Sequence, residues 1–144
     1  MPAEQNYSNH RRWYPLFHFV VQPLLVLNFL SHLVRFIMTP SWELAFWTLL
    51  SITLVLLAFA SRLMALKAQD RVIRLEERLR YKDILSPEVV ERANALSVGQ
   101  MIALRFASDG ELSGLIERTL NGEFAKNRDI KKAITNWRAD HLRV

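Results

Sequence analysis

Cysteine is absent from this chain, so disulfides, thiolate metal sites and cysteine nucleophiles are excluded. Glycine is scarce, at 4 of 144 residues, and none of the four precedes a lysine. A phosphate-binding loop of the Gly-Lys-Ser or Gly-Lys-Thr type is therefore missing, which excludes a P-loop ATPase. No His-x-x-x-His pair marks a zinc site. We expect a protein without enzymatic activity, metal or cofactor.

Charged side chains are rare in the first part of the chain and concentrated in the second. Residues 67–144 contain 15 of the 19 lysines and arginines and 12 of the 14 acidic residues. The whole chain is 51% hydrophobic and has a pI near 10.0, an unusual combination for a soluble protein. The two parts are therefore expected to lie in different environments.

Two apolar runs, residues 16–38 and 42–66, are long enough to cross a membrane, which takes about 20 helical residues. Both must be helical if they span, because lipid offers no partners for backbone N–H and C=O groups. The connection at residues 39–41 is so short that it predicts a tight antiparallel hairpin. Thr39 is expected to cap the second helix, with Pro40 at its first position.

Basic residues flank the two runs on one side only. Arg11 and Arg12 precede the first run, and Lys67 and Arg71 follow the second. The positive-inside rule then places both termini in the cytoplasm, with residues 1–15 as a cytoplasmic N-terminal segment. A cleaved signal peptide is the alternative for the first run, but the run is too long and no small-residue cleavage site follows. The expected location is the inner membrane of a bacterium.

Polar side chains in the first run follow one face of the predicted helix. Four of them share the spacing i, i+3, i+4, i+7, and two more lie on the adjoining flank. Because polar groups are costly in lipid, this face is expected to point at protein or to line a pathway. Pro23 lies within the same run and predicts a kink. The stripe consists of His18, Gln22, Asn28, Ser31, His32 and Arg35.

Two interpretations of this polar stripe stay open. One is a hydrogen-bonded seam, within the hairpin or between copies of it; the other is a ligand, ion, proton or haem site that uses His18 and His32. These histidines lie about 21 Å apart along a helix, so one copy cannot hold a single metal between them, and we favour the seam. Arg35 and Glu43 flank the turn and are candidates for an ion pair. The second run carries a facing stripe of Thr48, Ser51, Ala58 and Arg62.

The second helix is predicted to continue as a charged extension, residues 67–85, because this segment lacks Gly and Pro and is rich in good helix formers. Two i, i+4 ion pairs are expected, Asp70 with Arg74 and Glu76 with Arg80. An apolar stripe on this segment favours either a short coiled coil or packing against the chain's own tail. The stripe comprises Leu66, Val72, Leu75 and Leu79.

Residues 86–144 are predicted to form a small cytoplasmic domain of three or four short helices. Ser86, Ser97 and Ser108 mark helix starts, the last two with glutamine or glutamate at capping-box spacing. A module of this size has only a marginal core, so it is expected to lean on the long helix or on a partner. The apolar faces expected in its core are Leu112, Leu115, Ile116 and Leu120, and Ile130, Ala133, Ile134 and Trp137.

The C-terminal segment combines an aromatic ring with charges, as protein-binding anchors do. The alternative, which we favour, is that Trp137 fills the small core while Asp140 pairs with a neighbouring arginine. Nucleic-acid binding is not expected, since acidic residues interleave with basic ones throughout residues 67–144. The candidate partner-binding residues are Trp137, Arg138, Asp140 and Arg143.

Short motifs stand at both ends of the chain. They are Gln5-Asn6-Tyr7 and Asn9-His10-Arg11-Arg12 at the start, and Ile130-Lys131-Lys132-Ala133-Ile134, Trp137-Arg138, Asp140 and Leu142-Arg143-Val144 at the close. These motifs resemble a bacterial family of short two-span membrane proteins that has no established function and whose members are sometimes labelled ABC transporter permeases. The resemblance covers the whole chain and implies two spans. It supplies no chemistry, and two spans enclose no translocation path unless several copies assemble.

The sequence therefore predicts an all-α protein: a two-helix transmembrane hairpin with an extended second helix and a small helical cytoplasmic tail domain. The expected function is that of a non-catalytic accessory or scaffolding component of a membrane complex, as a homo-oligomer or with a protein partner. The alternative is a small oligomeric channel or transporter subunit that uses the polar face of the first helix. Carboxylate pairs such as Glu88 and Glu91 are explained as first-turn charges favoured by the helix dipole.

Overall fold

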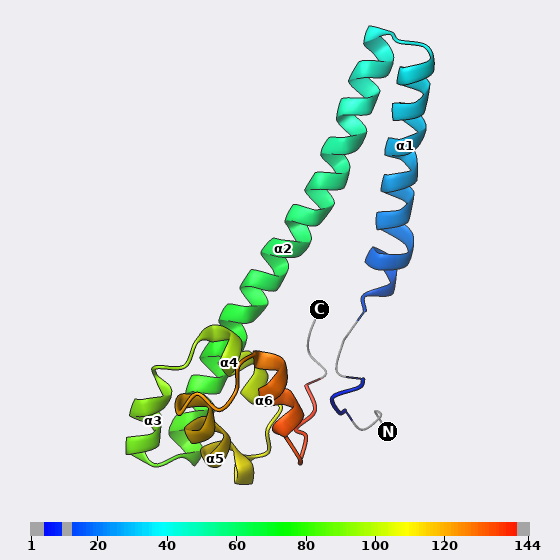
Figure 1. Ribbon diagram of the computed structural model, residues 1–144. Helices are drawn as coiled ribbons and strands as arrows, with labels where there is room; N and C mark the ends of the chain where they lie inside the picture. The colour runs from blue at the N-terminus through cyan, green and yellow to red at the C-terminus, as the bar shows by residue number, and fades with distance from the viewer. Residues whose placement is uncertain (1–4, 10–12, 141–144) are drawn as a thin grey trace. The chain divides into compact units, whose positions relative to one another are not determined.

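The computed structural model describes residues 5–9 and 13–140, and their regular structure is helical apart from one isolated bridge between Ala107 and Trp137. The prediction of an all-helical chain is thus confirmed for these residues. They divide into two compact units, residues 13–67 and residues 68–140 together with 5–9. The elements in Figure 1 are η1 (Leu16–Val21), α1 (Gln22–Met38), α2 (Trp42–Ile84), α3 (Pro87–Ala93), α4 (Val98–Leu104), α5 (Asp109–Leu120) and α6 (Asn127–Ala133).

The first apolar run begins as a π-helix, η1, and continues as α1. Pro23 stands in the first turn of α1, lacks a backbone N–H and would press its ring against the carbonyl of the residue four before it. The wider π turn accommodates this, and the N–H of Gln22 bonds to the carbonyl of Phe17, five residues back. The structure thus has a π-helical segment immediately before Pro23, where the sequence predicts a kink.

The short connection between α1 and α2 is capped differently from the prediction. The hydroxyl of Ser41 accepts a bond from the N–H of Leu44 at 3.2 Å, which makes Ser41 the N-cap of α2. Thr39 instead belongs to the end of α1, because its hydroxyl donates to the Arg35 carbonyl at 3.0 Å. The assignment of Thr39 as the cap of the second helix was wrong.

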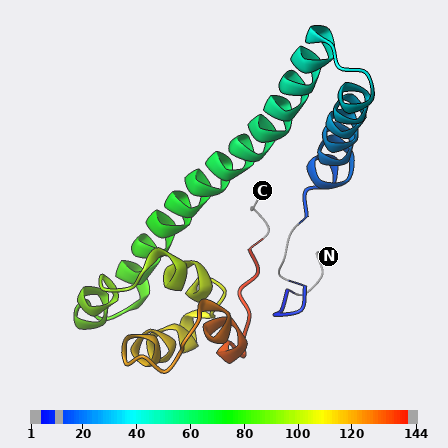
Figure 2. The ribbon, with the colours of Figure 1, turned by 45° about the horizontal axis from the view of Figure 1, so that its top comes forward.

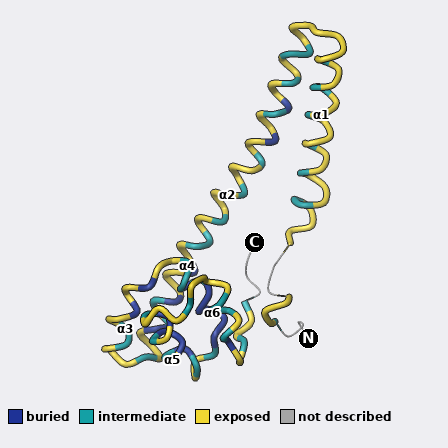
Figure 3. The backbone as a smooth tube through the Cα atoms, viewed as in Figure 1, coloured by how far each residue is buried: buried dark blue, intermediate teal, exposed yellow. Residues whose placement is uncertain are grey.

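Apolar side chains are mostly exposed in the unit of residues 13–67. No residue of η1 or α1 is buried, and in α2 up to residue 67 only Ser51 and Val55 are. Figure 3 shows the exposed colour along α1, whereas the buried colour gathers among α3 to α6. A helix with this surface is stable where its surroundings are also apolar.

The helices α3 to α6 build a small core with the last turns of α2. The helix α4 packs on α6 and α5, while α3 packs on α5 (Figure 2). Their buried apolar residues form a single cluster that includes the predicted Leu112, Leu115 and Ile116, with Leu120 at its margin. The helix α6 ends at Ala133, so Ile134 and Trp137 reach this cluster from an extended segment rather than from the helix that the sequence predicts.

Only one of the two predicted capping boxes is present. Ser97 accepts from the N–H of Gln100, and the Gln100 side chain accepts from the N–H of Ser97. At Ser108 no side-chain cap bond forms, so that prediction was wrong. The carboxylate of Glu111 accepts a backbone hydrogen bond from Ser108, and it also accepts the hydroxyl of Thr135 at 2.6 Å and the backbone N–H of Asn136 at 3.1 Å. It thereby ties the start of α5 to the segment after α6.

Candidate functional site

The structure divides the polar stripe predicted on the first helix into two groups. Asn28, Ser31 and Arg35 are exposed, whereas the other three residues are half-buried. An exposed polar face on an apolar helix requires a partner outside this chain if lipid surrounds it. The half-buried group consists of His18, Gln22 and His32.

Two polar side chains contact aromatic rings across the interface between α2 and the first helix. His32 stacks on Trp47 with ring centroids 6.2 Å apart, and the Arg62 guanidinium lies 6.0 Å from the Phe17 ring. Thr48 and Ser51, predicted to bond across the contact, donate instead to carbonyls of their own helix at 2.7 and 2.8 Å. Within the part of the chain that the structure describes, no hydrogen-bonded seam joins these helices.

The expected ion pair at the turn is not formed either. Arg35 and Glu43 have no salt bridge to each other among the described residues. Both side chains are exposed, and an exposed pair of this kind contributes little to stability.

The two histidines of the first helix have different surroundings. His18 Nδ1 lies 3.0 Å from the carbonyl oxygen of Tyr14, so its ring is engaged with its own helix. Residues 5–9 and 13–140 contain no group of three His, Asp or Glu side chains that could hold a metal. His32 differs, since its buried Nδ1 has no hydrogen-bond partner among these residues, and the same is true of both amide atoms of Gln22.

The tail contains a buried ion network that the spacing of charges did not predict. Arg80 donates to Asp109 at 2.6 Å, to the carbonyl of Ala107 at 2.7 Å and to Glu77 at 3.2 Å. The predicted pair of Arg80 with Glu76 was wrong, because the buried side of α2 carries Glu77 instead. Burial raises the pKa of the Glu77 carboxyl, while the nearby Arg80 and Arg138 guanidinium groups oppose the rise.

The candidate C-terminal anchor residues take part in the tail's own packing. The Trp137 ring lies 5.0 Å from the Phe106 ring, and its N–H donates to the carbonyl of Ile134. Asp140 pairs with Arg105 at 2.8 Å, and not with Arg138, which pairs with Glu77 at 3.4 Å. Arg143 lies outside the described residues.

The terminal motifs of the sequence meet in the structure. The Gln5 side chain accepts the backbone N–H of Asp140 at 2.8 Å, and the Lys132 ammonium lies 5.7 Å from the Tyr7 ring. Residues 10–12 and 142–144 of these motifs lie outside the described residues. The contacts show that motifs from opposite ends of the chain lie against each other.

Two features of the segment 68–84 were not recognised in the sequence. Tyr81 is 2% exposed, and Arg78 beside it lines a cavity. The spacing of Ile73, Glu77 and Tyr81 at i, i+4, i+8 marks the buried face of α2 and was the signal that could have found it. The predicted stripe of Val72, Leu75 and Leu79 lies on another face and is 54 to 61% exposed.

The molecule is thus an all-helical protein with two apolar helices long enough to cross a membrane and a small helical tail. A family model matches the chain over residues 1–144, and the chain belongs to this family, DUF6526, a family of unknown function. No curated protein and no solved structure matches the chain.

Proposed function

We propose that this chain is a non-catalytic integral membrane protein that crosses a bacterial inner membrane twice as a helical hairpin, with both termini in the cytoplasm. In this role it is an accessory or scaffolding component of a membrane complex. The observation that carries the proposal is the exposure of apolar side chains on both long helices: Phe19, Leu27 and Leu56 are 65%, 65% and 60% exposed. Soluble monomers rarely leave so large an apolar surface uncovered, and lipid would cover it.

Neither a soluble core helix nor a cleaved signal sequence fits the two apolar helices as well. The core helix of a soluble protein is mostly buried, and neither η1 nor α1 has a buried residue. A cleaved signal sequence would account for the first helix alone, but α2 follows α1 after a short turn and is also apolar enough to span. The pair of helices supports a hairpin in the membrane.

The absence of native cysteine makes topology directly measurable. Single cysteines are placed by Ser8→Cys before the first helix, by Pro40→Cys in the turn and by Ala125→Cys in the tail. With a membrane-impermeant maleimide on intact spheroplasts, we expect labelling of the Pro40→Cys variant only. The other two should react only after lysis. Labelling of all three in intact spheroplasts, or release of the protein by alkaline carbonate, would contradict the proposal.

A protein partner is supported by the exposed apolar stripe of α2. The opposite face of this segment packs on the tail through Ile73 and Tyr81, so Val72, Leu75 and Leu79 remain uncovered. Apolar residues at this spacing on one helix pair with a second helix, from another copy or from another protein. We place the contact with the partner protein at this stripe. Arg138 and Asp140 are less suitable because they pair within the chain.

The partner contact is tested with two matched variants of neighbouring exposed residues. Val72→Gln removes an apolar side chain from the stripe, and Arg74→Gln changes an exposed side chain two residues away on another face. Native mass spectrometry of material purified in mild detergent should show a complex with the unchanged protein and with Arg74→Gln. Loss of the complex in Val72→Gln is expected. Equal masses for all three proteins would remove the stripe from the proposal.

The alternative function, a small oligomeric channel, is favoured by one observation. Gln22 and His32 have buried polar atoms that find no partner among the described residues, and Asn28 and Ser31 are exposed on the same helix. Hairpins assembled around this face would surround a polar pathway. In reconstituted vesicles His32→Leu should abolish ion flux, whereas Thr53→Leu, at an exposed position of α2, should not. Absence of flux with the unchanged protein rejects this alternative.

A further inference from the structure

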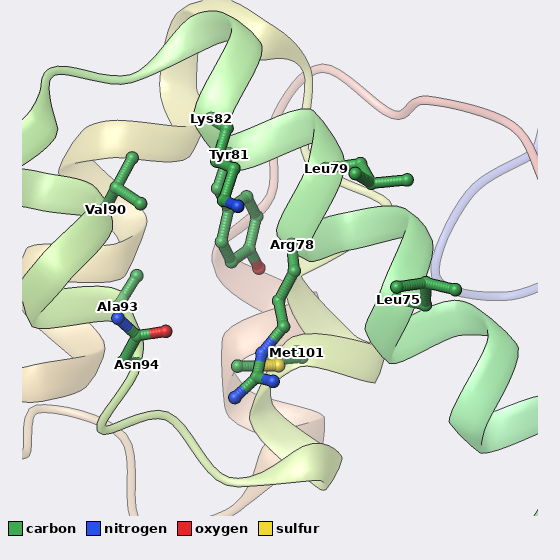
Figure 4. A pocket seen from close by; sticks show the side chains of 9 residues that line it. All are labelled: Leu75, Arg78, Leu79, Tyr81, Lys82, Val90, Ala93, Asn94 and Met101. Carbon is green, nitrogen blue, oxygen red and sulfur yellow. The ribbon is translucent and has the colours of Figure 1, made fainter.

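A cavity of about 390 Å³ opens in the tail between the end of α2, α3 and α4. This volume lies in the range of about 300 to 1,000 Å³ that is usual for small-molecule sites. Figure 4 shows the side chains from α2 and from the α3 segment on opposite sides of the space. The cavity, called here the Arg78 pocket, is lined by Leu75, Arg78, Leu79, Tyr81, Lys82, Val90, Ala93, Asn94 and Met101.

The charge of the Arg78 pocket has one sign. Arg78 and Lys82 are cationic, and none of the lining residues is acidic. Most of the remaining wall is apolar, which lowers the local dielectric constant and strengthens the attraction of an anion to these cations. The pocket therefore combines a cationic corner with a surface suited to an alkyl group.

Two buried polar groups of the pocket have no partner among the described residues. The hydroxyl of Tyr81, a residue only 2% exposed, and the Nε of Arg78 make no hydrogen bond within residues 5–9 and 13–140. Buried polar groups are nearly always paired, because an unpaired one costs more free energy than a bond gains. An oxygen-rich ligand would satisfy both groups.

The neighbouring Arg80 shows that arginines on this part of α2 do not in general lack hydrogen-bond partners. Arg80, two residues along α2, has Asp109, Ala107 and Glu77 as partners. The same helix thus uses Arg80 to hold the tail together and leaves Arg78 facing a cavity. Arginine presents a planar set of donors that matches phosphate and carboxylate oxygens.

Tyr81 is available as a donor at any physiological pH. Burial raises the pKa of its phenol far above the ordinary value, and the adjacent Glu77 carboxylate adds to the rise. The hydroxyl therefore stays protonated and can donate to an anionic oxygen.

We propose that the Arg78 pocket binds an anionic amphiphile, a molecule with one phosphate or carboxylate head group on an alkyl chain. Arg78 and the Tyr81 hydroxyl hold the head group, and Lys82 adds positive charge. The alkyl part lies against the apolar wall that includes Val90 and Met101. This binding site goes beyond the membrane topology proposed above and does not depend on it, but it shares Leu75 and Leu79 with the proposed partner stripe.

The test uses the full chain in phosphatidylcholine nanodiscs, titrated by calorimetry with decyl phosphate, decanoate and inorganic phosphate. Decyl phosphate or decanoate should bind saturably. Arg78→Met should weaken that binding at least tenfold, and Tyr81→Phe several-fold. Arg74→Met, which removes an exposed arginine one turn earlier that does not line the pocket, should leave it unchanged. Subtracting the Arg78→Met titration removes partition into the bilayer.

The two amphiphiles distinguish a phospholipid-like from a fatty-acid-like ligand, and preference for either supports the proposal. Tyr81→Phe keeps the ring and loses a hydroxyl that makes no bond in the described part of the protein, so it serves as the variant that retains its fold. Equal binding by the unchanged protein and Arg78→Met would overturn the proposal. Inorganic phosphate binding as tightly as decyl phosphate would also overturn it, since the alkyl part would then contribute nothing.

Discussion

The two units of this chain differ in how many of their large apolar side chains they bury. In residues 13–67 most large apolar residues are exposed, and only Ser51 and Val55 are buried. In the other unit the part of the chain from α3 to α6 buries most of its own, with Phe106 and Leu112 at 0% exposure, although the stripe on α2 remains exposed. Both units are helical, so the helix itself does not explain the difference. The side chains that a helix leaves exposed indicate the medium it is suited to.

The units also differ in the number and pairing of their charged side chains. The tail surrounds its core with paired ions, such as Arg80 with Asp109 and Arg105 with Asp140. The apolar unit has few charges, and its Arg35 is exposed near the turn. Charged side chains beside the tail's core need a partner of opposite charge to add to stability. Charged side chains on an apolar helix lie near its ends.

The comparison is tested most strongly by truncating one phenylalanine in each unit. Phe106→Ala should cost about 4 kcal/mol, because a fully buried ring is lost from the tail's small core. Phe19→Ala, at a residue 65% exposed, should change tail stability by less than about 0.5 kcal/mol. Thermal unfolding of the tail, monitored by limited proteolysis, measures both changes in stability. Comparable losses in the two variants would mean that the units do not differ as described.

Overpacking the buried polar position of α2 should have the next largest effect. Ser51→Leu inserts a large side chain where the residue is 3% exposed and should cost about 2 kcal/mol of helix association. Thr53→Leu, at an exposed position of the same helix, is the matched control and should be neutral. The midpoint of an SDS titration, followed by circular dichroism, reports the difference. A neutral Ser51→Leu would show that this face of α2 is not packed.

The carboxylate of Glu111 predicts a pH dependence that belongs to the tail. Burial alone would raise its pKa, but hydrogen bonds from Thr135, Asn136 and Ser108 together lower it. Its contribution is therefore complete above the ordinary value of 4.5 and is lost as the pH falls through the lowered pKa. Glu111→Ala should cost about 1.5 kcal/mol at pH 7.

The measurement for Glu111 is the difference in melting temperature between the unchanged protein and Glu111→Ala across pH. The difference should shrink as the pH drops below 4.5. Glu88→Ala, an exposed first-turn residue of α3, is the control with a smaller and flatter difference. A difference that grows toward acid would contradict the assigned sign.

The smallest expected effects come from two glycines in the tail. A Cβ on Gly99 would meet the Nδ2 atom at the end of the Asn127 side chain, which has to turn aside, so Gly99→Ala should change stability by about 0 kcal/mol. Gly114 lies within α5 with open space around it, and Gly114→Ala should stabilise by about 0.5 to 1 kcal/mol. Urea unfolding midpoints measure both. Equal gains would show that the Asn127 side chain does not restrict the space beside Gly99.

Local features of the structure were predictable, and distant pairings were not. The helical character of both apolar runs follows from their length and composition, and the Ser97 capping box follows from Gln100 three residues later. Glu111 has the same spacing after Ser108, yet the Ser108 hydroxyl forms no cap bond, and Glu111 also bonds to Thr135, 24 residues away. Asp140 likewise pairs with Arg105 rather than with the nearby Arg138. The spacing of residues along a helix predicts which neighbours can pair. It does not predict a partner that folding brings from another element.

Which segments are helical and apolar follows from the sequence alone, because backbone propensity and hydrophobic patterning act within a few turns. Part of the tail's core follows as well, since Leu112, Leu115 and Ile116 share one face of one helix, but the buried Tyr81 and Phe106 were not predicted. Which charged side chains pair and which do not depends on the folded arrangement of the helices. Arg78 and Arg80 are residues of the same type, two positions apart in one helix. Folding brings Asp109 to Arg80, whereas Arg78 lines a cavity. That choice depends on the packing of α2 with α3, α4 and α5, which no local pattern encodes.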